Sequence, residues 1–435
     1  MGDMKGKPGA GLFDVRGMPA WCCTDGVDVH VISVDDYRAE VTALLGSRPR
    51  AARPLADCAG LVLAEDVCAG VALPPFDNSA VDGYALRAAD VREPGTASPA
   101  ELPVVGDLPA GATHAPALPP GTTMRIMTGA PMPPGADSVV KVEHTNGGAR
   151  RVGVHAPVRR GDNVRRAGED LMHASIALHR GTVLNPPQLA LAASTGRHEL
   201  LVSNPPRVLL VSTGSELVPA PALLQPGQIY DANSIMLSTA IRALGCEVET
   251  IARIADDAEA FRQAIEPILP TFDLLVTSGG VSVGAYEVVK EALAPRGVRF
   301  KNIAMRPGGP QGCGRWNGVP VIALPGNPTS ALVSYEILLR PALRASTGYL
   351  QAERPRRKAG LTEALTSPQG RTQFLPGTYS DSDQHSCGRA VVPFAGKTSH
   401  WLTSFARANC LITLPEQLTD ADRGDEVDIL LLYCE

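Results

Sequence analysis

Residues 207–216 read RVLLVSTGSE, and this stretch decides the fold. Its run of four aliphatic residues is typical of a strand buried on both faces, and the Ser-Thr-Gly behind it is typical of a tight turn. The pattern returns until about residue 348: strands are predicted at 208–211, 247–251, 274–276 and 319–324, and helices at 233–244, 257–268, 287–294 and 329–343. Strands that alternate with helices predict a parallel α/β sheet with helices on both faces.

The segments on either side of this α/β region follow other patterns. Ser33 can cap a helix, Asp35 and Asp36 suit its first turn, and apolar residues follow at helical spacing, whereas residues 1–30 are Gly-rich and predict a flexible extension. Short apolar runs among many Pro and Gly residues predict a β-rich domain at 73–159. The tail predicts short strands separated by turns, so a small C-terminal β-barrel, or else a sandwich, is expected.

Length and composition exclude several classes of protein. A chain of 435 residues exceeds one hydrophobic core, so the chain is expected to be multidomain. A net charge of −5 and an aromatic content of 4% argue against nucleic acid as a partner. No apolar run is long enough to span a bilayer, so no membrane partner is expected. Nine scattered cysteines without a CxxC pair indicate a reducing compartment, and a cytoplasmic location is expected.

Three segments rich in Gly, Ser or Pro follow predicted strands, at residues 212–216, 278–284 and 324–328. The carboxyl ends of parallel strands share one edge of a sheet, so these loops are expected to meet there. Glycines let backbone N–H groups approach a phosphate, and a helix N-terminus adds partial positive charge. Any one loop alone can equally be an ordinary turn. Together they predict a phosphate-binding site with these substrate-binding residues: Thr213, Gly214, Ser278, Gly279, Gly280, Ser282, Gly284, Pro325, Gly326 and Asn327.

A second polar cluster lies in the β-rich region, where residues 75–85 read PFDNSAVDGYA. Asp77 and Asp82 can present a carboxylate there, although the more ordinary explanation is that both are Asx-turn residues. Segments 125–130 and 165–170 place arginine beside glycine. These arginines can hold a phosphate or pair with surface acids, and the sequence leaves both alternatives open.

Two other kinds of site lack their signatures. No HExxH motif or close His-carboxylate cluster occurs, and His173 and His179 are isolated, so a zinc site is not expected. No GxSxG motif occurs either, which argues against a Ser-His-Asp hydrolase.

Ten motifs follow one another from about residue 77 onward: DNSAVDGYA, RIMTGAPMPPGAD, RRAGED, STGSEL, GQIYDAN, SGGVSVG, RPGGP, LPGNP, GRTQF and SHWLTSFARANC. Each is moderately specific, and the ordered set is highly specific. With these motifs the chain resembles the molybdenum insertase family, also called molybdopterin molybdenumtransferase, which includes bacterial insertases and the gephyrin E domain. The resemblance covers the chain from about residue 33 to its end.

This resemblance implies an elongated homodimer of four-part chains and a Mg²⁺-dependent reaction. In that reaction molybdate, a substrate, is inserted into adenylylated molybdopterin, and AMP is released. A molybdopterin adenylyltransferase and a molybdoenzyme are further implied partners. The expected domains are an N-terminal helix at 31–50 packed on the α/β domain, a linker domain at 51–72 and 160–187, the β-rich domain at 73–159, an α/β molybdopterin-binding domain at 188–350 and a C-terminal β domain at 351–435.

The resemblance also implies roles for individual residues. By similarity, the Asp82 segment reaches the cleft of a partner subunit, and Thr128 lines the same region as a substrate-binding residue. The implied catalytic residues are Asp82, Asp170 and Glu287. Molybdate is expected to contact Arg306, Ser330, Arg371 and Ser404.

Some positions depart from the family pattern. The family's KPGKP turn is RPGGP at 306–310, so one of two cations is kept, and Ala285 and Ser215 stand where the family has acids. Glu287 remains two positions beyond Ala285. It can still be the metal ligand, because Mg²⁺ prefers carboxylate oxygen.

These departures keep three hypotheses in view. The leading one is an active insertase, because the phosphate loops, Asp82, Arg371 and Ser404 are present. The alternative is a non-catalytic paralogue that binds molybdopterin or finished cofactor and carries it to a molybdoenzyme, as Ala285, Ser215 and Gly309 suggest. A third, a purely structural scaffold, has no support in the sequence.

Overall fold

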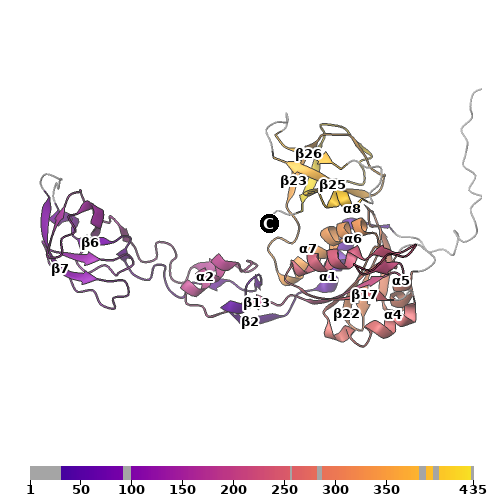
Figure 1. The fold of residues 1–435 in the computed structure, drawn as a ribbon, viewed down its shortest axis with the longest axis horizontal. Helices are drawn as coiled ribbons and strands as arrows, with labels where there is room; N and C mark the ends of the chain where they lie inside the picture. Colours follow the sequence, from indigo (N-terminus) through magenta and orange to yellow (C-terminus); the bar gives the residue numbers. More distant parts are fainter. Residues whose placement is uncertain are drawn as a thin grey trace, which may run out of the picture.

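The computed structural model describes residues 31–91, 99–254, 257–281, 287–381, 388–394 and 401–432. Figure 1 shows them as an extended chain of bodies: a β-rich domain at one end, a linker with α2, β2 and β13, and an α/β domain beneath a C-terminal barrel at the other end. The extension predicted at 1–30 lies outside the described residues. No helix in the described part of the chain is long and apolar enough to cross a membrane.

The α/β domain is built on a seven-stranded sheet in the order β1-β19-β21-β22-β18-β14-β17. Strands β22, β18, β14 and β17 are parallel, as the sequence predicts. The strands are Val31–Ile32 (β1), Arg207–Thr213 (β14), Glu247–Ile254 (β17), Leu274–Ser278 (β18), Val298–Ile303 (β19), Pro310–Trp316 (β21) and Val319–Leu324 (β22).

The sheet differs from the prediction because β21 runs antiparallel to both β19 and β22, so the sheet is mixed. Neither β19 nor β21 was predicted. Gly312 and Gly314 lower the strand propensity of β21, yet the fold needs them there. A Cβ at Gly312 would lie 2.7 Å from the Phe300 ring on β19, and one at Gly314 would overlap the Gly297 carbonyl oxygen.

Helices cover both faces of the sheet, as predicted. One face packs against α1, α3, α6 and α7, and the other packs against α4 and α5. The predicted helix at 329–343 is continuous but contains a π-helical stretch, Tyr335–Leu339. The helix bounds are Val34–Leu45 (α1), Ala232–Arg242 (α3), Ala258–Ile265 (α4), Val288–Leu293 (α5), Pro328–Ser334 (α6) and Arg340–Thr347 (α7).

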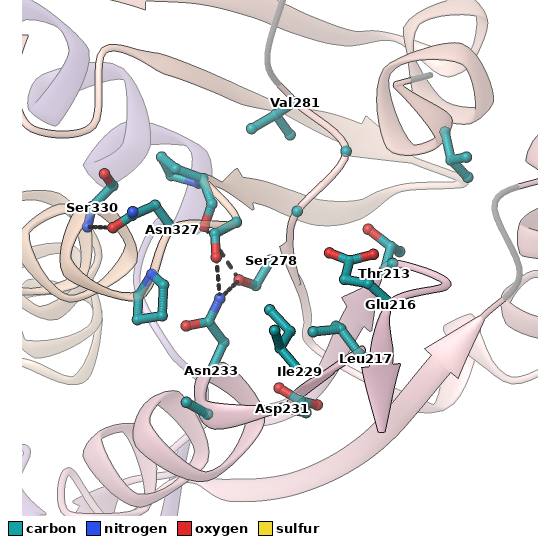
Figure 2. Close-up of a pocket in the computed structure, with 18 of the residues that line it drawn as sticks. Thr213, Glu216, Leu217, Ile229, Asp231, Asn233, Ser278, Val281, Asn327 and Ser330 are labelled. Carbon is teal, nitrogen blue, oxygen red and sulfur yellow. Dashed lines mark hydrogen bonds between the residues drawn. The ribbon is translucent and has the colours of Figure 1, made fainter. Parts of the chain in front are cut away.

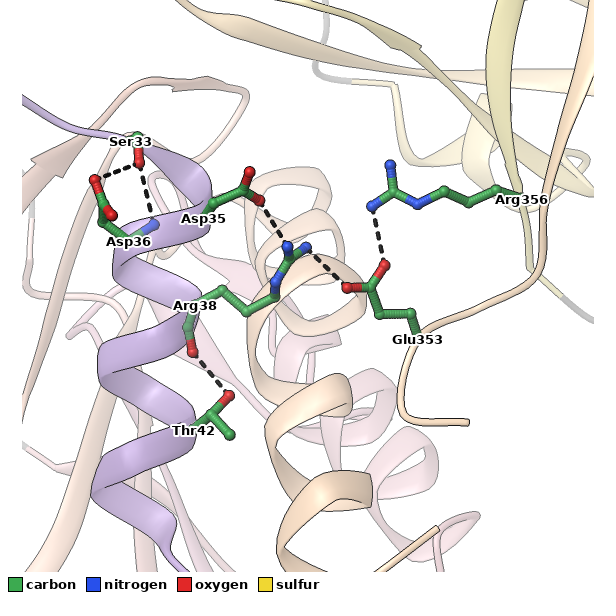
Figure 3. A network of polar contacts seen from close by, with 7 residues as sticks. All are labelled: Ser33, Asp35, Asp36, Arg38, Thr42, Glu353 and Arg356. Carbon is green, nitrogen blue, oxygen red and sulfur yellow. Dashed lines mark hydrogen bonds and ion pairs between the residues drawn. The ribbon is translucent and has the colours of Figure 1, made fainter. Parts of the chain in front are cut away.

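The N-terminal helix α1 is held by a side-chain cap at its N-terminus and by ion pairs of Arg38. Ser33 caps it by accepting a hydrogen bond from the Asp36 N–H at 3.1 Å, as predicted. Arg38 pairs with Asp35 in the same helix and with Glu353, which lies on the segment between α7 and the barrel and also pairs with Arg356 (Figure 3). This chain of charges ties α1 to the segment that leads into the C-terminal domain.

The linker is formed by segments from two parts of the chain. Strand β13 (Glu199–Ser203) pairs with β2 (Arg50–Pro54) and β3 (Val62–Leu63), and β4 (Val67–Cys68) pairs with β12 (Ile176–Leu178). Helix α2 (Pro186–Ser194) packs on the same core. The sequence division had assigned residues from 188 onward to the α/β domain. The structure groups α2 and β13 with the linker, because their apolar side chains pack against residues from the 58–67 segment.

The β-rich domain has a five-stranded sheet in the order β10-β7-β8-β6-β9. A two-stranded ladder between β5 (Asn78–Ser79) and β11 (Val164–Arg165) joins it to the returning chain. The sheet strands are Gly83–Leu86 (β6), Ala100–Leu108 (β7), Thr123–Ile126 (β8), Ser138–Lys141 (β9) and Arg151–Val154 (β10).

The C-terminal domain is a closed small β-barrel, which decides between the barrel and sandwich alternatives. Strands β25, β26, β23, β29 and β27 pair in a ring, because β25 also pairs with β27. Strand β20 (Met305–Arg306) of the preceding domain joins the outside of β25, and a short helix, α8 (Leu402–Phe405), covers one end. The barrel strands are Arg356–Leu361 (β23), Thr372–Ser380 (β25), Ala390–Pro393 (β26), Cys410–Leu414 (β27) and Glu426–Leu431 (β29).

Candidate functional site

The loops at the carboxyl ends of β14, β18 and β22 meet around one cavity of about 560 Å³ (Figure 2). The sequence predicted this convergence, and the cavity collects most of the predicted loop residues. Ser282 and Gly284 lie outside the described residues, as does Ala285. The predicted residues that line the cavity are Thr213, Gly214, Ser278, Gly279, Gly280, Glu287, Pro325, Gly326, Asn327 and Ser330.

Glycine is required where these loops approach one another. Gly279 has a φ of +98°, and a Cβ there would lie 2.7 Å from the Thr213 carbonyl oxygen of the first loop. A Cβ at Gly326 of the third loop would lie 3.2 Å from the Cα of Gly279. The three turns are therefore in mutual contact through backbone, which keeps their peptide groups close to the cavity.

The first turn of α6 is less available to an anion than the sequence suggested. Asn327 Oδ1 accepts hydrogen bonds from the N–H groups of Thr329 at 3.0 Å and Ser330 at 3.4 Å, and Pro328 has no N–H. The side-chain cap thus occupies donors that were expected to face a phosphate. The glycine loops, rather than this helix turn, supply the backbone that can approach an anion.

Acidic side chains line the same cavity. Glu216 folds back so far that a Cβ at Gly214 would lie 2.5 Å from its Oε2. Asp231 caps α3 by accepting from the Ser234 N–H at 3.0 Å, and Glu287 stands beside the second loop. The GQIYDAN motif contains Asp231 and Asn233, and the sequence alone indicated no role for either residue. Asp231, two positions before the helix predicted at 233–244, was the available signal.

Metal-binding side chains do not cluster strongly at this edge of the sheet. Within the described ranges, no three or more His, Cys, Asp or Glu side chains gather as a potential metal site. A cation here would depend on one or two carboxylates together with oxygens from a bound substrate.

The four residues expected to contact molybdate are divided among three places. Arg306 on β20 pairs in register with Gln373 of β25, so Arg371 lies two positions before that partner, and both arginines are exposed. Ser330 lines the main cavity. Ser404 lines a separate cavity of about 440 Å³ in the barrel, on α8, which packs against β25 and α6.

A buried glutamine that the sequence did not indicate holds the 306–310 turn. Gln311 Nε2 donates to the Gly308 carbonyl oxygen and to Ser334 Oγ, both at 2.8 Å. Gly308 also lines the main cavity, and a Cβ there would lie 2.7 Å from Ser334 Oγ. Gln311 therefore fixes the turn against the α6 segment.

Asp82 and Thr128 form a compact pair in the β-rich domain. Asp82 Oδ1 accepts from the Thr128 N–H at 2.7 Å and from its hydroxyl at 2.8 Å. These two donors, the N–H first, hold the pKa of the Asp82 carboxyl below its ordinary value. Asp170 is exposed on the segment between β11 and β12. Within one chain, these residues lie in a different body from the cavity of the α/β domain (Figure 1).

Asp77 has a different role from Asp82. Its carboxylate accepts from the Ala167 N–H at 2.8 Å and from Arg166 Nη1 at 2.6 Å. The N–H bond, followed by the Arg166 interaction, lowers the pKa of the Asp77 carboxyl. The sequence left open whether these arginines hold a phosphate or pair with surface acids. Arg166 forms a surface ion pair with Asp77 and so stabilises the turn that leads to Asp82.

Comparison with known proteins places the chain in a family. Molybdopterin molybdenumtransferase 2 of Mycobacterium tuberculosis is 43% identical to it over 404 residues, which cover 91% of this chain and 98% of that relative. The chain belongs to the molybdopterin molybdenumtransferase family. Three family models match successive parts: MoeA N-terminal region (domain I and II) at residues 32–196, Probable molybdopterin binding domain at 209–345, and MoeA C-terminal region (domain IV) at 358–432.

Other members of the molybdopterin molybdenumtransferase family agree in both sequence and fold. Molybdopterin molybdenumtransferase 1 of the same bacterium is 34% identical over 422 residues, covering 92% of this chain and 99% of the relative. The crystal structure of the molybdopterin biosynthesis moea protein from Pyrococcus horikosii has a TM-score of 0.76 and 32% identity, covering 92% of this chain and 99% of that one. The family resemblance stated from the ten motifs is confirmed.

Proposed function

We propose that this chain inserts molybdate into adenylylated molybdopterin and releases AMP. The observation that carries the proposal is the single cavity formed by the three loops after β14, β18 and β22, beside a turn that bears Arg306. Its volume of about 560 Å³ lies within the usual range for small-molecule sites. Curated relatives that match this chain over 98% and 99% of their own length carry the name molybdopterin molybdenumtransferase, which supports a transferase acting in molybdenum cofactor biosynthesis.

The loops would hold the phosphoanhydride that joins AMP to the pterin. Gly279, Gly280 and Gly326 allow peptide groups to approach its oxygens without a side chain between them. Thr213 and Ser278 add hydroxyl groups on the same wall. The acidic neighbours Glu216 and Glu287 disfavour a bare anion, so a substrate accompanied by a cation fits this cavity better than free phosphate.

Magnesium is part of the proposal, and the donors present fit it. Mg²⁺ is commonly held by one or two carboxylates together with substrate phosphates and water. Glu287 and Glu216 both line the cavity beside the phosphate loops, and Glu287 is the ligand expected from the sequence. When bound, the ion would neutralise negative charge on the anhydride and assist its hydrolysis.

Molybdate would be held where the α/β domain meets the barrel. Arg306 lies on β20, and Arg371 directly precedes β25, the strand with which β20 pairs. Guanidinium groups suit a tetrahedral oxyanion because they donate in a fork. Ser330 from α6 and Ser404 from α8 would add hydroxyl donors from the two sides of that boundary. In this arrangement molybdate would bind next to the cavity of the three loops, close to the proposed position of the pterin.

Asp82, Thr128 and Asp170 would act in the cavity of a partner subunit. This homodimer is proposed from the family resemblance and from the separation of the two regions within one chain. An apolar surface beside the cavity suits a second copy: Ile235 of α3 is 71% exposed, and Ile229, Tyr230 and Leu402 are also exposed. Between α3 and α8 this surface contains a largely apolar cavity of about 780 Å³.

The remaining parts of the proposal concern the cell. A molybdopterin adenylyltransferase is the proposed supplier of the adenylylated substrate, and a molybdoenzyme is the proposed acceptor of the cofactor. The cytoplasm is the proposed location, and the free thiols at all described cysteines agree with a reducing compartment. The carrier hypothesis is not favoured, since the curated relatives are named as transferases.

The test is a reconstituted reaction. Purified protein is mixed with adenylylated molybdopterin, Mg²⁺ and molybdate, AMP is measured by chromatography, and cofactor is measured by activation of an apo-molybdoenzyme. We expect both products, and neither without protein. Tight pterin binding with no AMP release would overturn the proposal in favour of the carrier hypothesis.

A further inference from the structure

Asn233 connects two of the three loops through one buried side chain. It is the second residue of α3 and only 8% exposed. Its Nδ2 donates to Ser278 Oγ of the second loop and to the Gly326 carbonyl oxygen of the third loop, both at 2.7 Å (Figure 2). Ser278 Oγ in turn lies 3.3 Å from the Pro325 carbonyl oxygen, to which it donates. One carboxamide thus spans the gap between the ends of β18 and β22.

The orientation of this carboxamide follows from its partners. A carbonyl oxygen can only accept, so the group that faces Gly326 must be the nitrogen. This leaves Asn233 Oδ1 buried with no hydrogen-bond partner among the described residues. An unpaired buried acceptor destabilises a fold, and an apolar residue would avoid that cost. The asparagine is therefore suited to its two donated bonds rather than to general packing.

Neighbouring contacts make the spacing of the two loops sensitive to this clamp. Gly326 and Gly279 are in backbone contact, and no side chain separates them. Apart from the sheet ladder between β18 and β22, Asn233 is the group that reaches both loops from a third element. Its loss would let the third loop move relative to the second without disturbing the strands below.

We propose that Asn233 is a positioning residue that sets the separation of the second and third loops for a ligand with two linked phosphates. The inference rests on the proposed function, since the phosphoanhydride of the substrate is such a ligand. A pyrophosphate group contacts both loops at once and depends on their separation. A single phosphate can settle against one loop and depends on it much less.

The experiment compares ADP with AMP as probes of two linked phosphates and of one. Both are titrated with Mg²⁺ by calorimetry into the full-length protein and into Asn233→Ala and Asn233→Asp. The aspartate keeps the shape but replaces both donors with an acceptor. For each variant we expect ADP to bind about tenfold more weakly, the value of one to two hydrogen bonds, and AMP affinity to change less than about threefold.

The matched control is Ser238→Ala on the same helix. Ser238 is also buried, but its hydroxyl donates to the Ile235 carbonyl oxygen within α3, so neither probe should change affinity. Thermal unfolding of every variant checks that the folded fraction is the same. Equal losses for ADP and AMP, or no loss for either, would overturn the positioning role while the proposed function stands. If the unaltered protein bound neither nucleotide, the proposed function itself would fail.

Discussion

The cavity of the α/β domain and the Asp82–Thr128 pair of the β-rich domain represent two ways of building a site. The cavity is assembled inside one sheet, where neighbouring parallel strands bring three loops to the same edge. The Asp82–Thr128 pair is equally well ordered, with two hydrogen bonds to one carboxylate oxygen, but it stands in a separate body. One site is shaped by its own sheet, and the other, in the proposed homodimer, meets its substrate only by placement against a partner chain.

This difference has a consequence for catalysis. Under the proposed function, groups within the cavity bind a nucleotide in a single chain, whereas Asp82 contributes only where two chains come together. Binding and turnover should therefore respond separately to mutation, and the following predictions use that separation.

The largest effect is expected from complementation between two inactive variants. Asp82→Asn and Glu287→Gln should each abolish AMP release, because each removes a proposed catalytic carboxylate. In a mixed dimer, one cavity keeps Glu287 and receives Asp82 from the partner. Random reassociation should therefore restore about a quarter of the unaltered turnover, measured as AMP released per chain.

A control separates complementation from simple mixing. Ile235→Asp places a charge on the exposed apolar face of α3 and should prevent pairing. When Ile235→Asp is added to both inactive variants, their mixture should show no AMP release, and light scattering should give the mass of a single chain. Recovery that persists in single chains would contradict the shared site.

Much of the fold could be predicted because local pattern and topology agree. Each predicted helix in the α/β domain has an observed counterpart, and Ser33 caps α1 as its side chain suggested. The convergence of the loops followed from the rule for parallel strands alone. The antiparallel β21 was missed because its glycines serve close packing against β19, a tertiary requirement that strand propensity does not record.

The parts of the site that were missed depend on distant contacts. Asn233 and Gln311 are ordinary amides in the sequence, and only the folded chain brings their donors to Gly326 and to Ser334. Helix α2 was assigned to the wrong domain because its apolar pattern does not say which core it joins. The proposed pairing of Asp82 with a partner chain has no local signal in the sequence and rests on the family resemblance.

The second largest effect should come from adding a methyl group where the first and second loops are in backbone contact. Gly279→Ala would place a methyl group 2.7 Å from the Thr213 carbonyl oxygen at a φ of +98°, so the second loop itself must change its backbone conformation, which a single phosphate also senses. We expect AMP affinity to fall by on the order of a hundredfold, or about 2.7 kcal/mol, by calorimetry. Gly318→Ala, at a φ of +84° with open space around it, should lose about 1–2 kcal/mol of stability and bind AMP normally.

A smaller and more selective effect is expected at the molybdate donors. Arg371→Ala removes one of two guanidinium groups proposed to hold the oxyanion, and it leaves the phosphate loops intact. The KM for molybdate should rise by about ten- to thirtyfold, the value of one charged hydrogen-bond pair, with AMP affinity unchanged. Arg357→Ala, an exposed arginine on β23, is the control and should change neither quantity. An equal loss of AMP affinity in Arg371→Ala would mean that the two subsites are not separate.

The smallest effect concerns the charge state of Asp82. Its folded-state pKa lies below the unfolded value because Thr128 donates two hydrogen bonds, so this interaction stabilises the fold above the unfolded pKa of about 3.9 and is lost as pH falls through the folded value. Thr128→Val removes the hydroxyl but keeps the N–H. The pKa of Asp82, followed by carboxyl ¹³C NMR, should rise part of the way toward its ordinary value. An unchanged pKa would mean that the Thr128 hydroxyl does not contribute to lowering the pKa of Asp82 beyond the effect of the N–H. Turnover at neutral pH should then also be the same in Thr128→Val as in the unaltered protein.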